Sequence, residues 1–381
     1  MNHGKILLGV CLALSSMLAR ADINVGVILS LTGPAASLGI PEKNALTLAA
    51  KTVGGEKINF IVVDDASDPT NAVTSAKKLV SVDKVDVILG TSTTGAALAM
   101  IETVFEGRTP TISLAASSRI TAPMDEKRQW LFKTIQNEAQ MAELTADHMR
   151  RNGVKKLGFI GFSDAYGDSW ADSMSKACAA AGIELVGVER YGRTDTSVTS
   201  QILKIMSLKP DAVFIAGSGT PAALPQKALA EKGYKVPVYQ TYGIANNDFL
   251  RVAGKDAEGS MFAVAPLLIA EQLADTHPSK KVALDLISRY EAAFGAGSMN
   301  IFASNAWDAW ILVERAIPFA LKSAKPGSAE FRKALRDALE NTREVVSSQG
   351  VFNMTPTDHV GYDNRARVMV RVKDGKWQLV R

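Results

Sequence analysis

The stretch that decides the fold is Val85-Asp86-Val87-Ile88-Leu89-Gly90-Thr91-Ser92-Thr93-Thr94-Gly95. Its first half is a short apolar run, typical of a strand that is buried on both faces of a parallel sheet. Its second half is rich in hydroxyl groups, as is Ala115-Ala116-Ser117-Ser118 after the next apolar run, 111–114. At the carboxyl edge of such a sheet, small residues let hydroxyls and backbone N–H groups reach an anion. The two loops therefore indicate a carboxylate clamp, with simple helix capping as the alternative.

Outward from this stretch, short β-branched runs alternate with amphipathic helical patterns, and the alternation restarts after Asn137. This order is typical of parallel sheets covered by helices on both faces, so the sequence predicts two α/β units in tandem. In the first unit we expect a helix from Pro41 to about Thr52, stopped by Gly54-Gly55. The expected strands are 23–29, 58–63, 85–89, 111–114, 156–161, 184–191, 212–216 and 238–240.

The last third of the chain does not predict a third domain. Helical patterns at 282–294, 303–324 and 329–342 have too few strands between them for a sheet of their own, and we expect them to pack on the first unit. Residues 367–380 alternate apolar and polar positions around Asp374-Gly375, which predicts a β-hairpin. A chain that leaves one unit, returns and leaves again crosses between lobes several times, as in a hinged clamshell.

The first 21 residues predict export. Lys5 precedes the apolar stretch 6–18, and Ala19-Arg20-Ala21 is a small-residue cleavage site, so we expect a signal peptide that is cleaved after Ala21. Cleavage removes Lys5 and Arg20, which leaves 41 of the 43 basic residues against 39 acidic ones. With no basic run and no interleaved aromatics, nucleic-acid binding is not expected. Cys178 is then the remaining cysteine, so no intramolecular disulfide is expected.

No constellation of residues predicts catalysis. His148, His277 and His359 have no partner at metal-ligand or triad spacing. The segment Gly217-Ser218-Gly219-Thr220-Pro221-Ala222 matches a dinucleotide fingerprint, but the next strand, 238–240, ends without the acidic residue that would hold a ribose. We therefore expect neither an enzyme, nor a metal, nor a cofactor.

Taken in order, these segments resemble the periplasmic Leu/Ile/Val-binding proteins, which are type I solute-binding proteins of ABC importers. The resemblance covers nearly the whole mature chain. The segments that carry it are 23–27, Leu31-Thr32-Gly33-Pro34, Val63-Asp64-Asp65 with Asp68-Pro69, the two hydroxyl loops, Tyr166-Gly167 and Ala257-Glu258-Gly259.

The resemblance implies an α/β fold of two Rossmann-like lobes, each a mostly parallel sheet flanked by helices, joined by three crossover segments. Lobe 1 would comprise residues 22–136 plus 267–351, and lobe 2 residues 137–266 plus 352–381. The implied protein is a periplasmic monomer that closes on a small carboxylate and passes it to an inner-membrane ABC permease. A periplasmic ligand sensor that reports to a receptor is the alternative of another class.

The resemblance also implies the ligand contacts. In the family, the loops matching 91–94 and 115–117 bind the α-carboxylate by hydroxyls and backbone groups, so Ser92 or Thr93 would be a hydroxyl donor. Tyr166 would line the cleft from the second lobe, and Thr220 would lie near its mouth. The full expected set is Ser92, Thr93, Thr94, Ala115, Ala116, Ser117, Asn137, Tyr166, Thr220, Tyr242 and Gly243.

The chain departs from the family's amino-acid binders on the ammonium side. Those proteins carry an acid after the strand matching 238–240, where Tyr242 stands here, and many have Asp at the position of Asn137. A buried ammonium without an anionic partner is disfavoured. Tyr166 and Tyr242 would form aromatic walls, with Phe302 or Trp307 as further wall or core. Such walls suit flat rings and branched chains. Our hypothesis is an aromatic or 2-oxo acid, with a branched-chain amino acid as the alternative.

Overall fold

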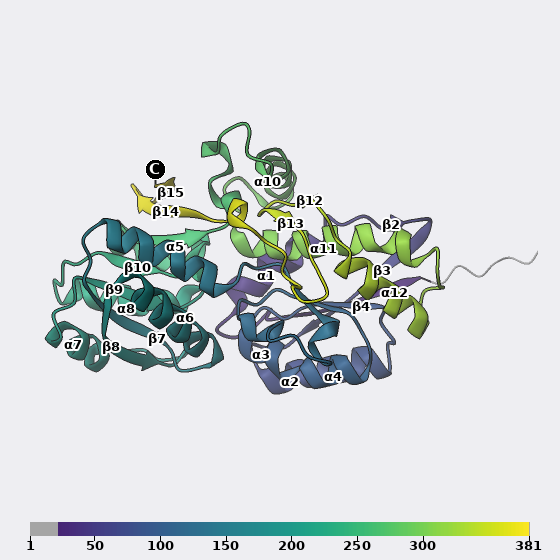
Figure 1. The fold of residues 1–381 in the computed structure, drawn as a ribbon, viewed down its shortest axis with the longest axis horizontal. Coiled ribbons are helices and arrows are strands. Elements are labelled where there is room, and N and C mark those ends of the chain that lie inside the picture. Colours follow the sequence, from purple (N-terminus) through teal and green to yellow (C-terminus); the bar gives the residue numbers. More distant parts are fainter. Residues whose placement is uncertain (1–21, 381) are drawn as a thin grey trace, which may run out of the picture.

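Two sheets form the framework of the protein and lie in separate lobes (Figure 1). The computed structural model describes residues 22–380, so the expected signal peptide, 1–21, lies outside the described residues. The first sheet has the order β2-β3-β1-β4-β5-β6, and its strands are parallel except for β2, which pairs antiparallel with β3. Its strands are β1 (Ile23–Leu29), β2 (Thr52–Val53), β3 (Glu56–Asp64), β4 (Val87–Gly90), β5 (Thr111–Ser113) and β6 (Leu131–Lys133).

The second sheet has the order β15-β14-β11-β10-β9-β7-β8. The strands β7 to β11 run parallel, and the expected carboxyl-terminal hairpin, β14–β15, adds two antiparallel strands at one edge. The bounds are β7 (Lys156–Phe162), β8 (Glu184–Tyr191), β9 (Ala212–Ala216), β10 (Val238–Gln240), β11 (Met261–Val264), β14 (Val368–Lys373) and β15 (Lys376–Leu379). The predicted fold class, two mostly parallel sheets flanked by helices, is confirmed.

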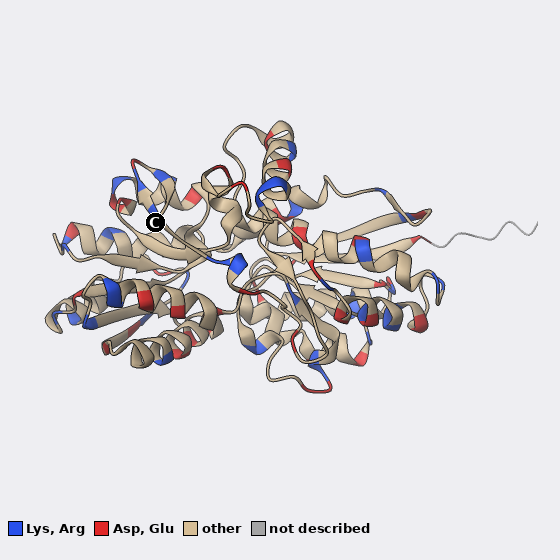
Figure 2. Cartoon of the chain, turned by 45° about the horizontal axis from the view of Figure 1, so that its top comes forward, with Lys and Arg blue, Asp and Glu red and all other residues tan. Residues whose placement is uncertain are grey.

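Helices cover the faces of both sheets, and Figure 2 shows basic and acidic residues intermixed on them, in line with the near balance of charge. Within residues 22–380, no helix is both long and apolar enough to cross a membrane. The helices are α1 (Ala36–Leu46), α2 (Pro69–Ser81), α3 (Thr94–Ala99), α4 (Ile101–Glu106), α5 (Glu138–Arg151), α6 (Ala165–Ala181), α7 (Thr199–Ser207), α8 (Ala223–Glu231), α9 (Asn247–Ala253), α10 (Lys280–Phe294), α11 (Ile301–Ala320) and α12 (Ala329–Glu340).

The chain passes between the lobes three times: after β6, after β11, and between the short ribbon β12 (Val345–Val346) with β13 (Val351–Phe352) and β14. As expected for the last third, α11 packs on the first lobe. It lies against α1, and its buried Trp310 ring meets Phe60 of β3 with ring centroids 5.2 Å apart. The residue boundaries given above for the two lobes stay a prediction.

The expected helix from Pro41 to about Thr52 is wrong at both ends. Helix α1 begins at Ala36 and holds Pro41 inside it, whereas Thr52 lies in β2. Gly54 and Gly55 have φ of 60° and 89° and form the turn from β2 into β3. Two successive residues with positive φ are what a tight hairpin turn requires, so these glycines close a hairpin rather than a helix.

Gly39 lets α1 approach the end of β1. A Cβ at this position would lie 2.1 Å from the carbonyl oxygen of Ser30, so no larger residue fits without moving the backbone. This approach places Leu38 and Glu42 of α1 beside the carboxyl end of β1, where the site described below is built.

We predict that Gly39→Ala lowers the free energy of unfolding by about 2–4 kcal/mol, because a backbone oxygen cannot step aside for the added methyl group. Urea denaturation of the mature protein measures the change. Gly95→Ala in α3 is the matched control: its Cβ would meet Pro69 at an ordinary 3.5 Å, and its effect should stay within about 1 kcal/mol of zero. Equal destabilisation by the two substitutions would contradict the close approach.

Candidate functional site

A narrow cavity with an empty volume of about 330 Å³ lies between the carboxyl ends of the two sheets. Its walls come from segments that follow β1, β4, β5 and β6 in the first lobe and β7, β8, β9 and β10 in the second, with one residue from the start of α11. The lining residues are Leu38, Ser92, Thr93, Thr94, Leu114, Ala115, Ala116, Ile135, Tyr166, Arg193, Ser218, Tyr242, Gly243 and Phe302.

Most of the residues expected at the site line this cavity: Ser92, Thr93, Thr94, Ala115, Ala116, Tyr166, Tyr242 and Gly243. Ser117, Asn137 and Thr220 are not among the lining residues. Ser117 is buried, and its hydroxyl shares a 2.8 Å hydrogen bond with the hydroxyl of Ser169 on α6. Thr220 is half-buried at the start of a 3-10 turn. Direct ligand contacts by any of these residues stay a prediction.

The first hydroxyl loop offers two buried side chains to the cavity. Ser92 Oγ accepts a hydrogen bond from the Ser30 N–H at 3.1 Å and is hydrogen-bonded to the carboxyl of Glu42. Thr94 Oγ1 is buried and makes no hydrogen bond to any residue between 22 and 380. A buried hydroxyl without a partner is rare in folded proteins, and its position on the cavity wall makes it available to a ligand.

The second hydroxyl loop rests on a buried lysine. Lys133 Nζ donates to the carbonyl oxygen of Ala116 and, at 2.8 Å, to Asn137 Oδ1. Burial lowers the pKa of Lys133 to about 8, against the opposing effect of Glu138 and Asp358. Asn137 therefore supports the second hydroxyl loop through Lys133 in this structure.

Aromatic side chains form the second-lobe wall. The Tyr166 hydroxyl donates to Thr241 Oγ1 at 2.7 Å, and the Tyr242 hydroxyl donates to the carbonyl oxygen of Gln136, across the lobes, at 3.3 Å. Burial raises the pKa of both tyrosines well above the ordinary value, so both hydroxyls stay neutral. Trp170 packs edge-on to Tyr242 with ring centroids 5.5 Å apart and holds this wall in place.

Arg193, like Ser218, is a polar lining residue that sequence reasoning missed. It follows β8, pairs with Asp164 Oδ2 at 2.6 Å and donates to Ser218 Oγ at 3.1 Å. Its guanidinium also lies 4.1 Å from the ring centroid of Phe162. Among the described residues that line the cavity, Arg193 is the one charged side chain. Its place just beyond the carboxyl end of a predicted strand was the available signal.

The apolar lining residues Leu38, Leu114 and Ile135 were also missed, because nothing in their local sequence distinguishes them from core residues. Phe302, which the sequence left open as wall or core, lines the cavity from the start of α11. Trp307 is not among the lining residues; the guanidinium of Arg289 lies over its ring, 4.6 Å from the centroid.

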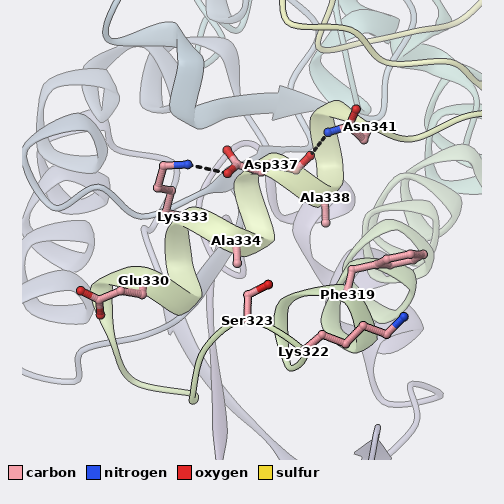
Figure 3. Close-up of a pocket in the computed structure, with 9 residues that line it drawn as sticks. All are labelled: Phe319, Lys322, Ser323, Glu330, Lys333, Ala334, Asp337, Ala338 and Asn341. Atoms are coloured by element: carbon pink, nitrogen blue, oxygen red, sulfur yellow. Dashed lines mark hydrogen bonds and ion pairs between the residues drawn. The ribbon is translucent and has the colours of Figure 1, made fainter.

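A second hollow lies on the outer face of the first lobe, between α11 and α12 (Figure 3). Two of its charged groups pair with each other: Lys333 Nζ donates to Asp337 Oδ2 at 2.6 Å. Phe319 on its rim is 62% exposed, so this surface is open to solvent. It gathers no buried polar group that a ligand could satisfy. Among residues 22–380, no group of three or more His, Cys, Asp or Glu side chains is arranged to hold a metal ion. The inter-lobe cavity is therefore the candidate site.

Comparison with known proteins gives a consistent result. The family model described as "Periplasmic binding protein" matches residues 22–376. Leu/Ile/Val-binding protein homolog 3 of Brucella melitensis biotype 1 is 28% identical over 350 residues, which cover 89% of each chain.

Two solved structures are similar along almost the whole length. An extracellular ligand-binding receptor from Rhodopseudomonas palustris HaA2 has a TM-score of 0.92 and 44% identity, covering 95% of this chain and 100% of that one. A solute-binding protein of an ABC transporter from Rhodopseudomonas palustris BisB5, in complex with 3,4-dihydroxybenzoic acid, has a TM-score of 0.78 and 25% identity, covering 94% of this chain and 96% of that one.

The buried lysine predicts a pH effect on stability. Since the pKa of Lys133 is about 8 in the folded protein and about 10.4 in an unfolded chain, the unfolded state binds more protons between these pH values. The free energy of unfolding of the unmodified protein should therefore rise, relative to Lys133→Met, by about 2.5 kcal/mol from pH 8 to pH 10.4. Denaturant titrations of both proteins across this range measure the difference. Parallel stability curves for the two proteins would contradict the assignment.

Proposed function

The chain belongs to the periplasmic binding protein family, and on that premise we propose that it captures a small acid without an amine, aromatic or 2-oxo, for delivery to an ABC importer. It is a periplasmic solute-binding protein of the Leu/Ile/Val-binding type, a class that binds small molecules and does not transform them.

The observation that carries the proposal is the charge of the cavity wall. Arg193 is the one charged side chain among the described lining residues, and Tyr242 stands where an acid would be needed for an ammonium group. Desolvating an ammonium ion without a carboxylate partner costs several kcal/mol, whereas a carboxylate gains from Arg193. The unpartnered hydroxyl of Thr94 adds a donor for the same anion.

The aromatic and apolar wall of the cavity supports an aromatic or branched acid. Tyr166, Tyr242 and Phe302 line the cavity, and aromatic side chains stack well on flat rings. The dihydroxybenzoate complex of the Rhodopseudomonas palustris BisB5 protein supports an aromatic acid and an ABC importer as the destination. The names of the Brucella relatives support a branched-chain amino acid as the second candidate.

Isothermal titration calorimetry on the mature protein tests the two candidates. Benzoate-type acids, aryl 2-oxo acids and leucine are titrated separately into the same preparation. We expect binding heat from at least one aryl acid and none from leucine. Tight leucine binding with silent aryl acids would overturn the proposal.

Replacing the cation of the wall tests the charge argument. We predict that Arg193→Gln weakens binding of the best aryl acid by about 10- to 100-fold, because a charge-assisted hydrogen bond to the carboxylate is lost. Asp164 is 34% exposed, so water can hydrate it once its partner is gone. Calorimetry at equal ionic strength gives the ratio of dissociation constants.

Arg190→Gln is the matched control. Arg190 lies on β8 and pairs with Asp168 at 3.2 Å, but it is not among the lining residues. Its replacement should leave the affinity within about threefold of the unmodified protein, as expected for an exposed ion pair. An equal loss of affinity in both variants would show that Arg193 does not act at the ligand.

A further inference from the structure

Behind Ser92 lies a carboxyl group that the proposed function does not use. Glu42 is fully buried on α1, and its Oε2 is hydrogen-bonded to Ser92 Oγ. Its other oxygen, Oε1, makes no hydrogen bond to any residue in the described part of the chain. Ser92 Oγ also accepts from the Ser30 N–H at 3.1 Å. Glu42 and Ser30, neither of which is among the lining residues, therefore fix the Ser92 hydroxyl.

No positive charge among residues 22–380 compensates this carboxyl. Asp65 is the charged group that acts on it, and an ionised Asp65 opposes ionisation of Glu42. The Asp65 carboxyl accepts from Ser30 Oγ at 2.7 Å, while its second oxygen, like Glu42 Oε1, has no partner among residues 22–380. Burial raises the pKa of Glu42 well above its ordinary value.

The elements packed around α1 do not change this picture. Strand β1 contains no titratable side chain between Ile23 and Leu29. The groups that shift the pKa of Glu42 are Ser92 and Asp65. No side chain of α10 or α11, and no lysine or arginine, is among them. The charged side chains of α11 are Asp308, Glu314 and Arg315, and Asp308 accepts from Ser348 and Gln349. On α10, Arg289 donates to the carbonyl oxygen of Leu48, and Tyr290 is hydrogen-bonded to Asn44.

We propose that Glu42 carries a proton and donates it in a hydrogen bond to Ser92 Oγ, which forces the Ser92 hydroxyl to donate into the cavity. This inference rests on the proposed function, since the acceptor of that donation is the ligand's carboxylate. Glu42 acts as a positioning residue: it contacts no ligand and sets the direction of the Ser92 proton.

The number of hydrogen bonds that Ser92 can make determines where its proton points. A serine hydroxyl has one proton to donate and two lone pairs to accept with. The Ser30 N–H occupies one lone pair and the Glu42 O–H the other, so the Ser92 proton is left for an acceptor on the cavity side. If Glu42 were ionised, Ser92 would donate to it, and the cavity would lose a donor and gain a nearby negative charge. An anion is thus bound best by the form with neutral Glu42.

The protonation state is tested without any ligand. The infrared difference spectrum between the mature protein and Glu42→Gln at neutral pH should contain the carbonyl stretch of one protonated carboxylic acid, lost in the variant. Asp65→Asn is the control: the Glu42 band should be absent from the difference spectrum between the mature protein and Asp65→Asn, because both proteins keep it, and present in the difference spectrum between Asp65→Asn and Glu42→Gln. Absence of an acid band that depends on Glu42 would overturn the proposal.

The positioning role is tested by affinity for the best-binding aryl acid. We expect Glu42→Met, which supplies no donor, to weaken binding about tenfold, and Glu42→Gln, whose amide donates permanently, to restore it. Affinity of the unmodified protein should hold at low and neutral pH and fall as the pH rises through the pKa of Glu42. The fall should be absent in Glu42→Gln.

The outcomes separate the two claims. An acid band together with equal affinity and the same pH profile in all three proteins would overturn the positioning role. If the acid band is present but no aryl or 2-oxo acid binds the unmodified protein, the proposed function fails, and the affinity tests are repeated with leucine, whose carboxylate offers the same acceptor.

Discussion

The site is built mainly from segments that follow the carboxyl ends of parallel strands. Because the strands within each parallel sheet point the same way, and because the two sheets face each other across these ends, the segments after eight strands converge on one small cavity. This constraint explains why residues as distant in sequence as Leu38 and Tyr242 line one cavity. It also explains why the close approach at Gly39 matters, since α1 reaches the cavity only by lying against the end of β1.

The electrostatics of the cavity follow from what lies on and behind its wall. Arg193 lines the cavity, and Lys133 Nζ donates to the carbonyl oxygen of Ala116. In the described part of the chain the carboxyl of Glu42 has no cationic partner, and burial raises its pKa well above the ordinary value. Both positive groups are held by hydrogen bonds, Arg193 by the carboxylate of Asp164 and the hydroxyl of Ser218. On the proposed function, donors that are already held in place reduce the cost of reorganisation when an anion binds.

Sequence reasoning predicted the parts of the site that depend on local order. Apolar runs locate strand ends, so the loop of Ser92 to Thr94, the loop of Ala115 and Ala116, and the tyrosines after β7 and β10 could be placed in advance. What it missed depends on pairing between distant residues. Arg193 is oriented by Asp164 and Ser218, and the hydroxyl of Ser117 is bonded to Ser169, 52 residues away.

The helix boundary at Pro41 failed for a related reason. The Gly54-Gly55 pair is compatible with a helix end and with a hairpin turn, and only the pairing of β2 with β3 distinguishes them. Glu42 was overlooked because an acid within an amphipathic pattern is normally solvated, whereas here α1 is covered by α11.

The central claim is that this cavity holds an acid that carries no amine. Mass spectrometry of the small molecule that co-purifies with the mature protein, released by denaturation, tests it most directly. The account predicts an aromatic or 2-oxo carboxylic acid in stoichiometric amount. Leucine, isoleucine or valine recovered in its place would contradict it.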